Sequence, residues 1–253
     1  MRRALTLIEI LVTTATIALL AAILLPSLSA AKNQARRSLC LSNLPQVGLA
    51  TAMYLDDSRD YFWRYYVDRR KGRYWWFGFE PGGPPSSTID VRHRPLVKSK
   101  GVLARYLRST DNGLQCPSFP YDSGAYFPKF AAPSASYGYN LRLGPANPWL
   151  QTSRRSAFIR RAATVFVFAD GVHFDFNPGM NEGHYIEYAE APAEPFAMGG
   201  FAHFRHSGKA AVLFMDGHSE CLRLISAPYS GPVEGGAAGN LSGPSGGPEM
   251  YGL

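Results

Sequence analysis

The feature that most constrains this chain is an uninterrupted apolar run near its N-terminus. The segment Leu5–Leu25 reads LTLIEILVTTATIALLAAILL, and Glu9 is its only charged residue. About 20 such residues, at 1.5 Å each, span the hydrocarbon core of a bilayer, so a transmembrane helix is predicted over residues 5–27. A removable secretory signal starting at Arg2 and Arg3 is the rival interpretation, but ordinary signals have an apolar stretch of only about 7–15 residues.

Glu9 needs an explanation, because an ionisable group inside a membrane costs about 2.5–3.5 kcal/mol on insertion scales. One interpretation places the carboxylate shallow enough, one turn into the helix, to reach the interface. The other is that the chain is cut before Leu5 and that the freed ammonium of a neighbouring copy pairs with Glu9. The residues alone leave both open.

The N-terminal pattern matches a known signal. MRRA followed by LTLIEILVT, an apolar run and Pro26 resembles the class III signal of type IV pilins and type II secretion pseudopilins. The resemblance implies that a prepilin peptidase cuts between Ala4 and Leu5, that Leu5 becomes N-methylated, and that Glu9 guides assembly. Ala4 stands where the leader usually ends in Gly, which implies slower cleavage. Pro26 falls where pilins place a helix-disrupting proline, although a proline here would also suit the end of the span.

A second helical segment is predicted over Ala30–Asp56. Its apolar residues recur at helical spacing and form one stripe of the kind that packs on a sheet; they are Cys40, Leu44, Val47, Thr51 and Tyr54. Pro45 and Gly48 predict a break in this helix, with a restart that Asn43 would cap.

The rest of the chain predicts a β-rich head, since 46% hydrophobic and 18% charged residues exclude a disordered chain. Tyr61–Phe79 holds two aromatic runs around the charged link Asp68–Arg73, which predicts a hairpin. Thr164–Asp170 predicts a strand. Residues 115–118 and 136–140 predict loops.

Asp216–Gly217 predicts a tight turn between strands Ala210–Met215 and His218–Leu224, and this dipeptide suits a two-residue type I′ turn. The chain has His206, then nine residues, then Asp216–Gly217. This pattern is similar to the C-terminal signature of a large group of pilin-like proteins. The resemblance also reaches residues 35–50, Cys116–Pro117 and residues 169–171. The plain interpretation is that Asp216 caps the turn and that His206 bonds to neighbouring backbone.

Residues 64–108 are strongly basic, with eleven Lys and Arg against three acids. Basic and aromatic side chains interleaved on a surface would bind single-stranded nucleic acid or glycans by stacking, and the net charge of +7 permits an anionic partner. Aromatic residues of strands more often form the core. Ligand binding is therefore kept as an alternative.

Five of the six histidines lie between residues 173 and 218, interspersed with carboxylates, which raises a membrane-anchored metal-dependent hydrolase as another alternative. No His-Glu-x-x-His or comparable spacing supports a catalytic metal. Related secretion pseudopilins use a structural calcium, and the resemblance implies such a site at Asp170, Asp175 and Glu182, where the loop supplies oxygen ligands.

The three cysteines, Cys40, Cys116 and Cys221, are an odd number, so at least one stays unpaired. A Cys40–Cys116 bridge, which would pin the helix to the head, is one pairing left open. Residues 231–253 contain eight Gly and three Pro, and a flexible tail is predicted over 227–253.

Together these patterns predict an α+β chain with a long N-terminal helix packed on an antiparallel β-sheet head. The expected parts are a leader (1–4), the transmembrane helix (5–27), an amphipathic helix (28–58), the head (59–226) and the tail. No nucleophile elbow, phosphate loop or dinucleotide fingerprint occurs, so no enzyme is predicted.

The resemblance implies a structural subunit of a type II secretion pseudopilus or type IV pilus-like filament. It would be a single-pass protein of a bacterial inner membrane, with its head in the periplasm, and then part of a periplasmic or cell-surface filament. Its partners would be prepilin peptidase and other pilin-like subunits. A minor pilin that binds DNA or glycan through its basic segment is an alternative function.

Overall fold

The computed structural model describes residues 6–82, 94–110, 113–144, 154–174, 180–186, 199–226 and 237–241. Within these residues there are one long helix, two short 3-10 helices and two sheets, joined by turns and loops. The elements are α1 (Leu7–Asp57), β1 (Tyr66–Arg69), β2 (Gly72–Trp75), β3 (Gly78–Pro81), η1 (Lys98–Lys100), β4 (Tyr137–Asn140), η2 (Ser156–Phe158), β5 (Phe166–Phe174), β6 (Met180–Glu182), β7 (Tyr185–Ile186), β8 (Gly199–Phe204), β9 (Lys209–Phe214), β10 (Ser219–Ser226) and β11 (Ala237–Leu241).

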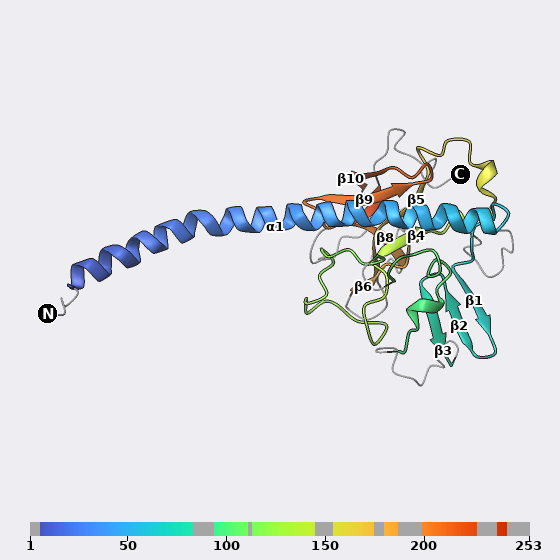
Figure 1. Cartoon of the computed structure of the whole chain (residues 1–253), viewed down its shortest axis with the longest axis horizontal. Helices are drawn as coiled ribbons and strands as arrows, with labels where there is room; N and C mark the ends of the chain where they lie inside the picture. Colours follow the sequence, from blue (N-terminus) through green and yellow to red (C-terminus); the bar gives the residue numbers. More distant parts are fainter. Residues whose placement is uncertain are drawn as a thin grey trace.

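Helix α1 lies in two different surroundings. The head covers its C-terminal part, whereas its N-terminal half projects away from the head (Figure 1). An apolar window of 18 residues in this helix has no buried residue, and the side chains of Leu7 and Ile23 are 83% and 67% exposed. The helix is long and apolar enough to cross a membrane. It also continues through Pro26, so this proline does not end it.

The first turn of α1 is closed by Thr6 and Glu9. Thr6 Oγ1 accepts the N–H of Glu9 at 3.3 Å, and Glu9 Oε2 accepts the N–H of Thr6 at 2.8 Å. This reciprocal arrangement is a capping box, which satisfies N–H groups that the first helical turn leaves without partners. The sequence interpretations of Glu9 did not include this role, although Thr-x-x-Glu is its usual spacing.

The predicted break near Asn43 is wrong, because α1 continues through Pro45. A proline removes the hydrogen bond to the carbonyl four residues before it. Here that carbonyl belongs to Leu41, and the hydroxyl of Ser219 donates to it at 3.4 Å. Asn43 does not cap a new helix but donates from Nδ2 to the carbonyl of Gln115 at 3.5 Å. The head thus supplies a hydrogen-bond donor to the helix carbonyl that Pro45 leaves without its usual partner.

The predicted apolar stripe of α1 is its contact with the head. The buried residues of the helix are Cys40, Leu44, Val47, Ala50, Thr51 and Leu55. Gly48 faces β9, and a Cβ at this position would lie 3.1 Å from Leu213 Cδ1. A glycine here allows the helix and the strand to approach closely.

Strands β5, β8, β11, β10 and β9 close into a ring, because β9 returns to pair with β5. Strand β5 serves both partners. Its residues 166–169 pair with β9, and its residues 171–174 pair with β8. Both faces of β9 are buried: Ala211 and Leu213 pack in the cluster that includes α1, whereas Ala210, Val212 and Phe214 belong to a second cluster.

Residues 137–140, within the predicted loop 136–140, form strand β4. Strand β4 pairs antiparallel with β5 and parallel with β7, so the sheet is mixed rather than purely antiparallel as predicted. Gly138 permits this pairing, because a Cβ there would lie 2.7 Å from Ile186 Cγ1. A glycine that the sequence suggested as a turn signal instead serves a close approach between strands.

The predicted hairpin at Asp216–Gly217 is present, but its turn differs from the prediction. The N–H of Phe214 donates to the carbonyl of His218 at 2.9 Å, which leaves a loop of three residues, and Gly217 has φ 91° whereas Asp216 has no positive φ. A three-residue loop ending in a left-handed glycine replaces the type I′ turn. Asp216 caps it as predicted, since its Oδ1 accepts the N–H of His218 at 3.2 Å.

The turn with the type I′ pattern lies at the other end of β9. Ser207 and Gly208 have φ values of 53° and 76°, and both central residues of a type I′ turn need positive φ. His206 and Lys209 exchange backbone hydrogen bonds of 3.0 and 3.2 Å across it. The dipeptide Ser-Gly gave a weaker signal than Asp-Gly, and the prediction missed it.

Part of the predicted flexible tail belongs to the sheet. Residues 237–241 form β11, which pairs antiparallel with β8 and β10, so the prediction is wrong for this segment. The segment Ala-Ala-Gly-Asn-Leu has little intrinsic strand preference. Its order comes from the two strands between which it inserts, and local sequence does not reveal those partners.

Replacing Gly217 with Val should lower the stability of the full chain by about 1–2 kcal/mol, because a side chain disfavours the left-handed backbone by roughly this amount. Nothing lies within 4 Å of a Cβ at this position, so the effect isolates backbone conformation. Gly217→Asn is the matched control, since Asn tolerates this region. Thermal unfolding of the detergent-solubilised chain by near-UV circular dichroism measures both. Equal melting temperatures for the two variants would contradict the assigned turn.

Candidate functional site

Four segments that are far apart in the sequence meet beside α1. Cys40 lies on α1, Cys116 in a loop, Asp170 on β5 and His206 in the turn between β8 and β9. All four residues are at most 4% exposed, and their sulfur, carboxylate and imidazole atoms lie within 4.8 Å of one another. We refer to these four residues as the Cys–Asp–His cluster.

Cys40 and Cys116 form a disulfide, with Cα atoms 5.3 Å apart and a sequence separation of 76 residues. This is the pairing that the sequence left open, and Cys221 is the free cysteine. A loop of this length makes the bridge worth about 4 kcal/mol in the chain-entropy model. Burial raises the pKa of the Cys221 thiol, and Arg37 Nε donates to its sulfur at 3.2 Å.

The His206 imidazole faces the disulfide. Its Nε2 lies 3.4 Å from Cys116 Sγ and 3.1 Å from Asp170 Oδ2. The prediction that His206 bonds to neighbouring backbone holds for its main chain, which pairs with Lys209, but is wrong for its side chain. Strand β8 ends at Phe204, and His206 begins the tight turn that follows, with its imidazole buried in the cluster.

Asp170 lies where β5 changes its partner from β9 to β8. Its Oδ2 accepts the N–H of Ala211 on β9 at 2.7 Å, so the side chain supplies a partner to the neighbouring strand. Arg205 Nε lies 3.5 Å from Asp170 Oδ1, and both side chains are fully buried. The same guanidinium donates to the carbonyls of Ser136 and Gly171 at 3.0 and 2.8 Å. The buried carboxylate is therefore matched by a buried cation.

Asp216–Gly217 lies apart from the cluster, in the turn after β9. His206 precedes β9 and Asp216 follows it, so the nine residues between them are this strand and its two flanking turns. Strand β9 has six residues and is about 20 Å long at 3.3 Å per residue. The structure therefore does not bring the His and Asp of the predicted signature together. It places them at opposite ends of one buried strand.

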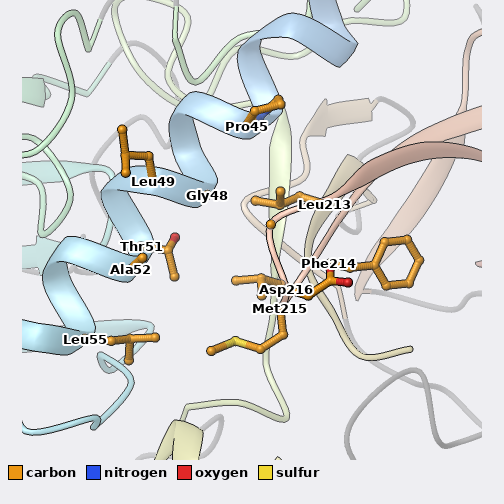
Figure 2. A pocket seen from close by; sticks show the side chains of 12 residues that line it. Pro45, Gly48, Leu49, Thr51, Ala52, Leu55, Leu213, Phe214, Met215 and Asp216 are labelled. Atoms are coloured by element: carbon orange, nitrogen blue, oxygen red, sulfur yellow. The ribbon is translucent and has the colours of Figure 1, made fainter. Parts of the chain in front are cut away.

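A groove of about 320 Å³ lies between α1 and the turn after β9 (Figure 2). Its lining residues are mostly apolar and come from the helix on one side and from β5, β9 and the turn after β9 on the other. They are Pro45, Gly48, Leu49, Thr51, Ala52, Leu55, Val167, Leu213, Phe214, Met215, Asp216 and Gly217. No member of the Cys–Asp–His cluster lines it.

The residues of the predicted calcium site have separate partners. Asp170 binds Ala211 and Arg205, whereas the carboxylate of Glu182 accepts the N–H and hydroxyl of Ser134 at 2.6 and 3.0 Å. Asp175 lies outside the described residues. The calcium site stays a prediction, and within the described residues Asp170 groups with His206 and the two cysteines instead.

Ser134, Glu182 and His184 form a second buried polar group. Ser134 Oγ lies 2.6 Å from His184 Nε2 as well as 3.0 Å from the Glu182 carboxylate. Burial raises the pKa of Glu182 to about 7 and lowers the pKa of His184 well below its ordinary value. A catalytic triad needs the imidazole between the hydroxyl and the acid. Here the serine lies between them, so the group fits a structural role better than nucleophile activation.

The basic and aromatic segment folds as predicted into a hairpin, β1 with β2, to which β3 adds a third strand. Trp75, Trp76 and Phe77 are buried. Arg73 pairs with Asp68 at 2.6 Å and stacks on Tyr66 at 4.1 Å. These aromatic residues pack with one another and with their own cations rather than forming an open row, which favours a core role over a binding platform.

Comparison with known proteins does not identify a family or a function for this chain. No family model, curated protein or solved structure matches the chain.

Sequence reasoning missed several residues that build these sites. Arg205 adjoins His206 in the sequence, but its burial against Asp170 depends on the fold. Ser134 gave no local signal, because it lies 48 and 50 residues before Glu182 and His184 in the sequence and meets them only in the folded chain. The capping role of Glu9 did have a signal, the three-residue spacing from Thr6.

Glu182 should make the stability of the chain depend on pH. Its native pKa is about 7 against an ordinary value of 4.5, so between these values the native chain keeps a proton that the unfolded chain has released. The contribution is fully present below about pH 4.5 and is lost as pH rises through 7, by on the order of 3 kcal/mol.

Glu182→Gln removes this titration. We therefore expect the stability of the wild type relative to the variant to fall between pH 4.5 and 7 and to become constant above it. Denaturant unfolding of the detergent-solubilised chain at several pH values measures the difference. Parallel stability curves for the two chains would show that Glu182 titrates normally.

Proposed function

We propose that this chain is a structural subunit of a pilin-like filament, either a type II secretion pseudopilus or a type IV pilus-like fibre. In this proposal α1 holds the chain in an inner membrane, with the head in the periplasm, until it assembles. Prepilin peptidase cuts between Ala4 and Leu5, and Leu5 is then N-methylated. Processing is inferred from the sequence resemblance, since residues 1–5 lie outside the described part of the chain.

The observation that carries the proposal is the division of α1 between two environments. The apolar side chains of its N-terminal half are exposed on all sides, with Leu11, Ile17 and Leu24 each more than 60% exposed. An apolar surface of this extent needs a cover other than water. Lipid would supply it for a single chain, and the same helices of neighbouring subunits would supply it in a filament.

The head supports this arrangement because it is fixed to one end of the helix only. The buried stripe begins at Cys40, and the residues before it in the exposed half make no part of the core. The disulfide at Cys40 ties the start of the stripe to the head. The projecting half of α1 thus stays available to lipid or to other subunits while the head remains folded.

Glu9 can serve assembly without giving up its place in the capping box. Both bonds from Thr6 go to Oε2, and a carboxylate accepts through two oxygens. The Leu5 ammonium of an adjoining subunit would bind at Oε1. The attraction would be strong there, because water is scarce and screening is weak within the membrane.

The mature chain should begin with N-methylated Leu5. A basic leader followed at once by the apolar span motivates this expectation. Mass spectrometry of the N-terminal peptide of the full-length protein from its membrane fraction measures it directly. Recovery of intact Met1, or of a chain that begins near Lys32, would refute the processing step.

Glu9→Ala should abolish incorporation into filaments while the folded head and the total protein stay unchanged. Glu9→Gln separates the charge from the cap, because Gln can also close a capping box but cannot pair with an ammonium. Thr6→Ala does the reverse, since it weakens the cap and keeps the charge.

In-cell cross-linking of all three variants measures multimers. The proposal expects loss of multimers for both Glu9 variants and their retention in Thr6→Ala. Normal multimers from Glu9→Gln, with loss in Thr6→Ala, would mean that Glu9 only caps the helix and would remove the charge from the assembly mechanism.

A further inference from the structure

The Cys–Asp–His cluster contains the donor atoms that zinc takes in proteins. Zinc binds thiolate, imidazole and carboxylate groups, usually four of them in a tetrahedron, with Zn–S bonds of about 2.3 Å and shorter bonds to nitrogen and oxygen. Neighbouring donors in such a site lie roughly 3.3–3.8 Å apart. His206 Nε2 already lies 3.4 Å from Cys116 Sγ and 3.1 Å from Asp170 Oδ2. The two distances from His206 are therefore close to those of a zinc site, and all four donor atoms lie within 4.8 Å of one another.

The two sulfur atoms become thiolate donors only when the disulfide opens. Two thiolates on one zinc ion lie about 3.8 Å apart, against about 2.05 Å in a disulfide, so each sulfur has to move by about 1 Å. The Cα atoms of Cys40 and Cys116 are 5.3 Å apart. Side-chain rotation over a movement this small leaves the helix and the loop in place.

The buried charges balance in both forms. With the disulfide intact, the carboxylate of Asp170 lies against the guanidinium of Arg205, and these two charges cancel. After reduction, two thiolates and Asp170 contribute three negative charges, and Zn²⁺ with Arg205 contributes three positive charges. A buried site tolerates only such balanced states, because an isolated charge is strongly disfavoured there. Asp170 Oδ1 also has no hydrogen-bond partner among the described residues.

We propose that the reduced chain binds one Zn²⁺ through Cys40, Cys116, Asp170 and His206, so that the helix and the head are joined either by a disulfide or by zinc. A dithiol reductant transfers two electrons and two protons to the disulfide and itself becomes a disulfide. Zinc then displaces the two thiol protons. The ion has four protein ligands and no open position, so this site is structural and not catalytic.

Zinc would keep α1 attached to the head whenever the disulfide is reduced. Metal ligation supplies folding free energy directly, as the disulfide does in the oxidised chain. The proposal does not depend on filament assembly, because it concerns only the contact between α1 and the head.

The test uses the full chain in detergent, reduced with a phosphine in denaturant and refolded without oxygen in the presence of one equivalent of Co²⁺ or Zn²⁺. We expect about one metal per chain, with thiolate-to-cobalt charge-transfer absorption and the visible bands of tetrahedral cobalt, which zinc then displaces. Zinc should protect two of the three thiols from alkylation, with Cys221 left reactive. The chelator EDTA should lower the melting temperature of the reduced zinc-loaded chain only.

The oxidised wild-type chain is the matched control, because it is folded and should bind no metal at this site. Cys221→Ser should retain the metal, whereas His206→Ala and Asp170→Asn should weaken binding by more than about 10-fold, since even the loss of outer partners costs 10–100-fold. Equal metal binding by oxidised and reduced chains, protection of Cys221, or failure of the reduced chain to refold with zinc present would overturn the proposal.

Discussion

The structure depends on one helix that meets two different environments along its length. The N-terminal half of α1 is apolar around its circumference and is not covered by the part of the head that the structure describes, whereas from Cys40 to Leu55 it presents a single buried stripe to the head. A helix that is apolar on all sides belongs inside a membrane or among other helices, and a striped helix belongs on a protein core. The position where one pattern changes to the other therefore fixes where the head can sit.

The head docks on α1 at the positions where the helix itself is weakest. Pro45 removes a backbone bond, and Ser219 donates to the released carbonyl of Leu41. Gly48 has poor helix propensity, but its missing side chain is what brings β9 into contact with the helix. Each local defect is compensated by a contact with a distant segment. The helix thus owes its continuity in this region to the head that it carries.

This compensation explains which features the sequence predicts and which it does not. The long apolar helix, the stripe and the β1–β2 hairpin depend on local periodicity, and they are present. The break at Pro45, the loop at residues 136–140 and the tail at 237–241 were also inferred from local signals, and tertiary contacts overrode each of them.

The candidate site shows the same division. Its Cys40–Cys116 pairing was one of several open choices, and the meeting of Asp170 with Arg205 and His206 follows from the strand order.

The nine-residue spacing between His206 and Asp216 acquires a physical meaning in this fold. From the cluster at Cys40 to the end of the stripe at Leu55, α1 rises about 22 Å at 1.5 Å per residue, and the six-residue strand β9 is of similar length. The turn before β9 places His206 beside the disulfide, and the turn after β9 lines the groove beside Leu55. The spacing therefore matches a strand to the stretch of helix that it covers, which is a packing constraint and requires no contact between the two residues that define it.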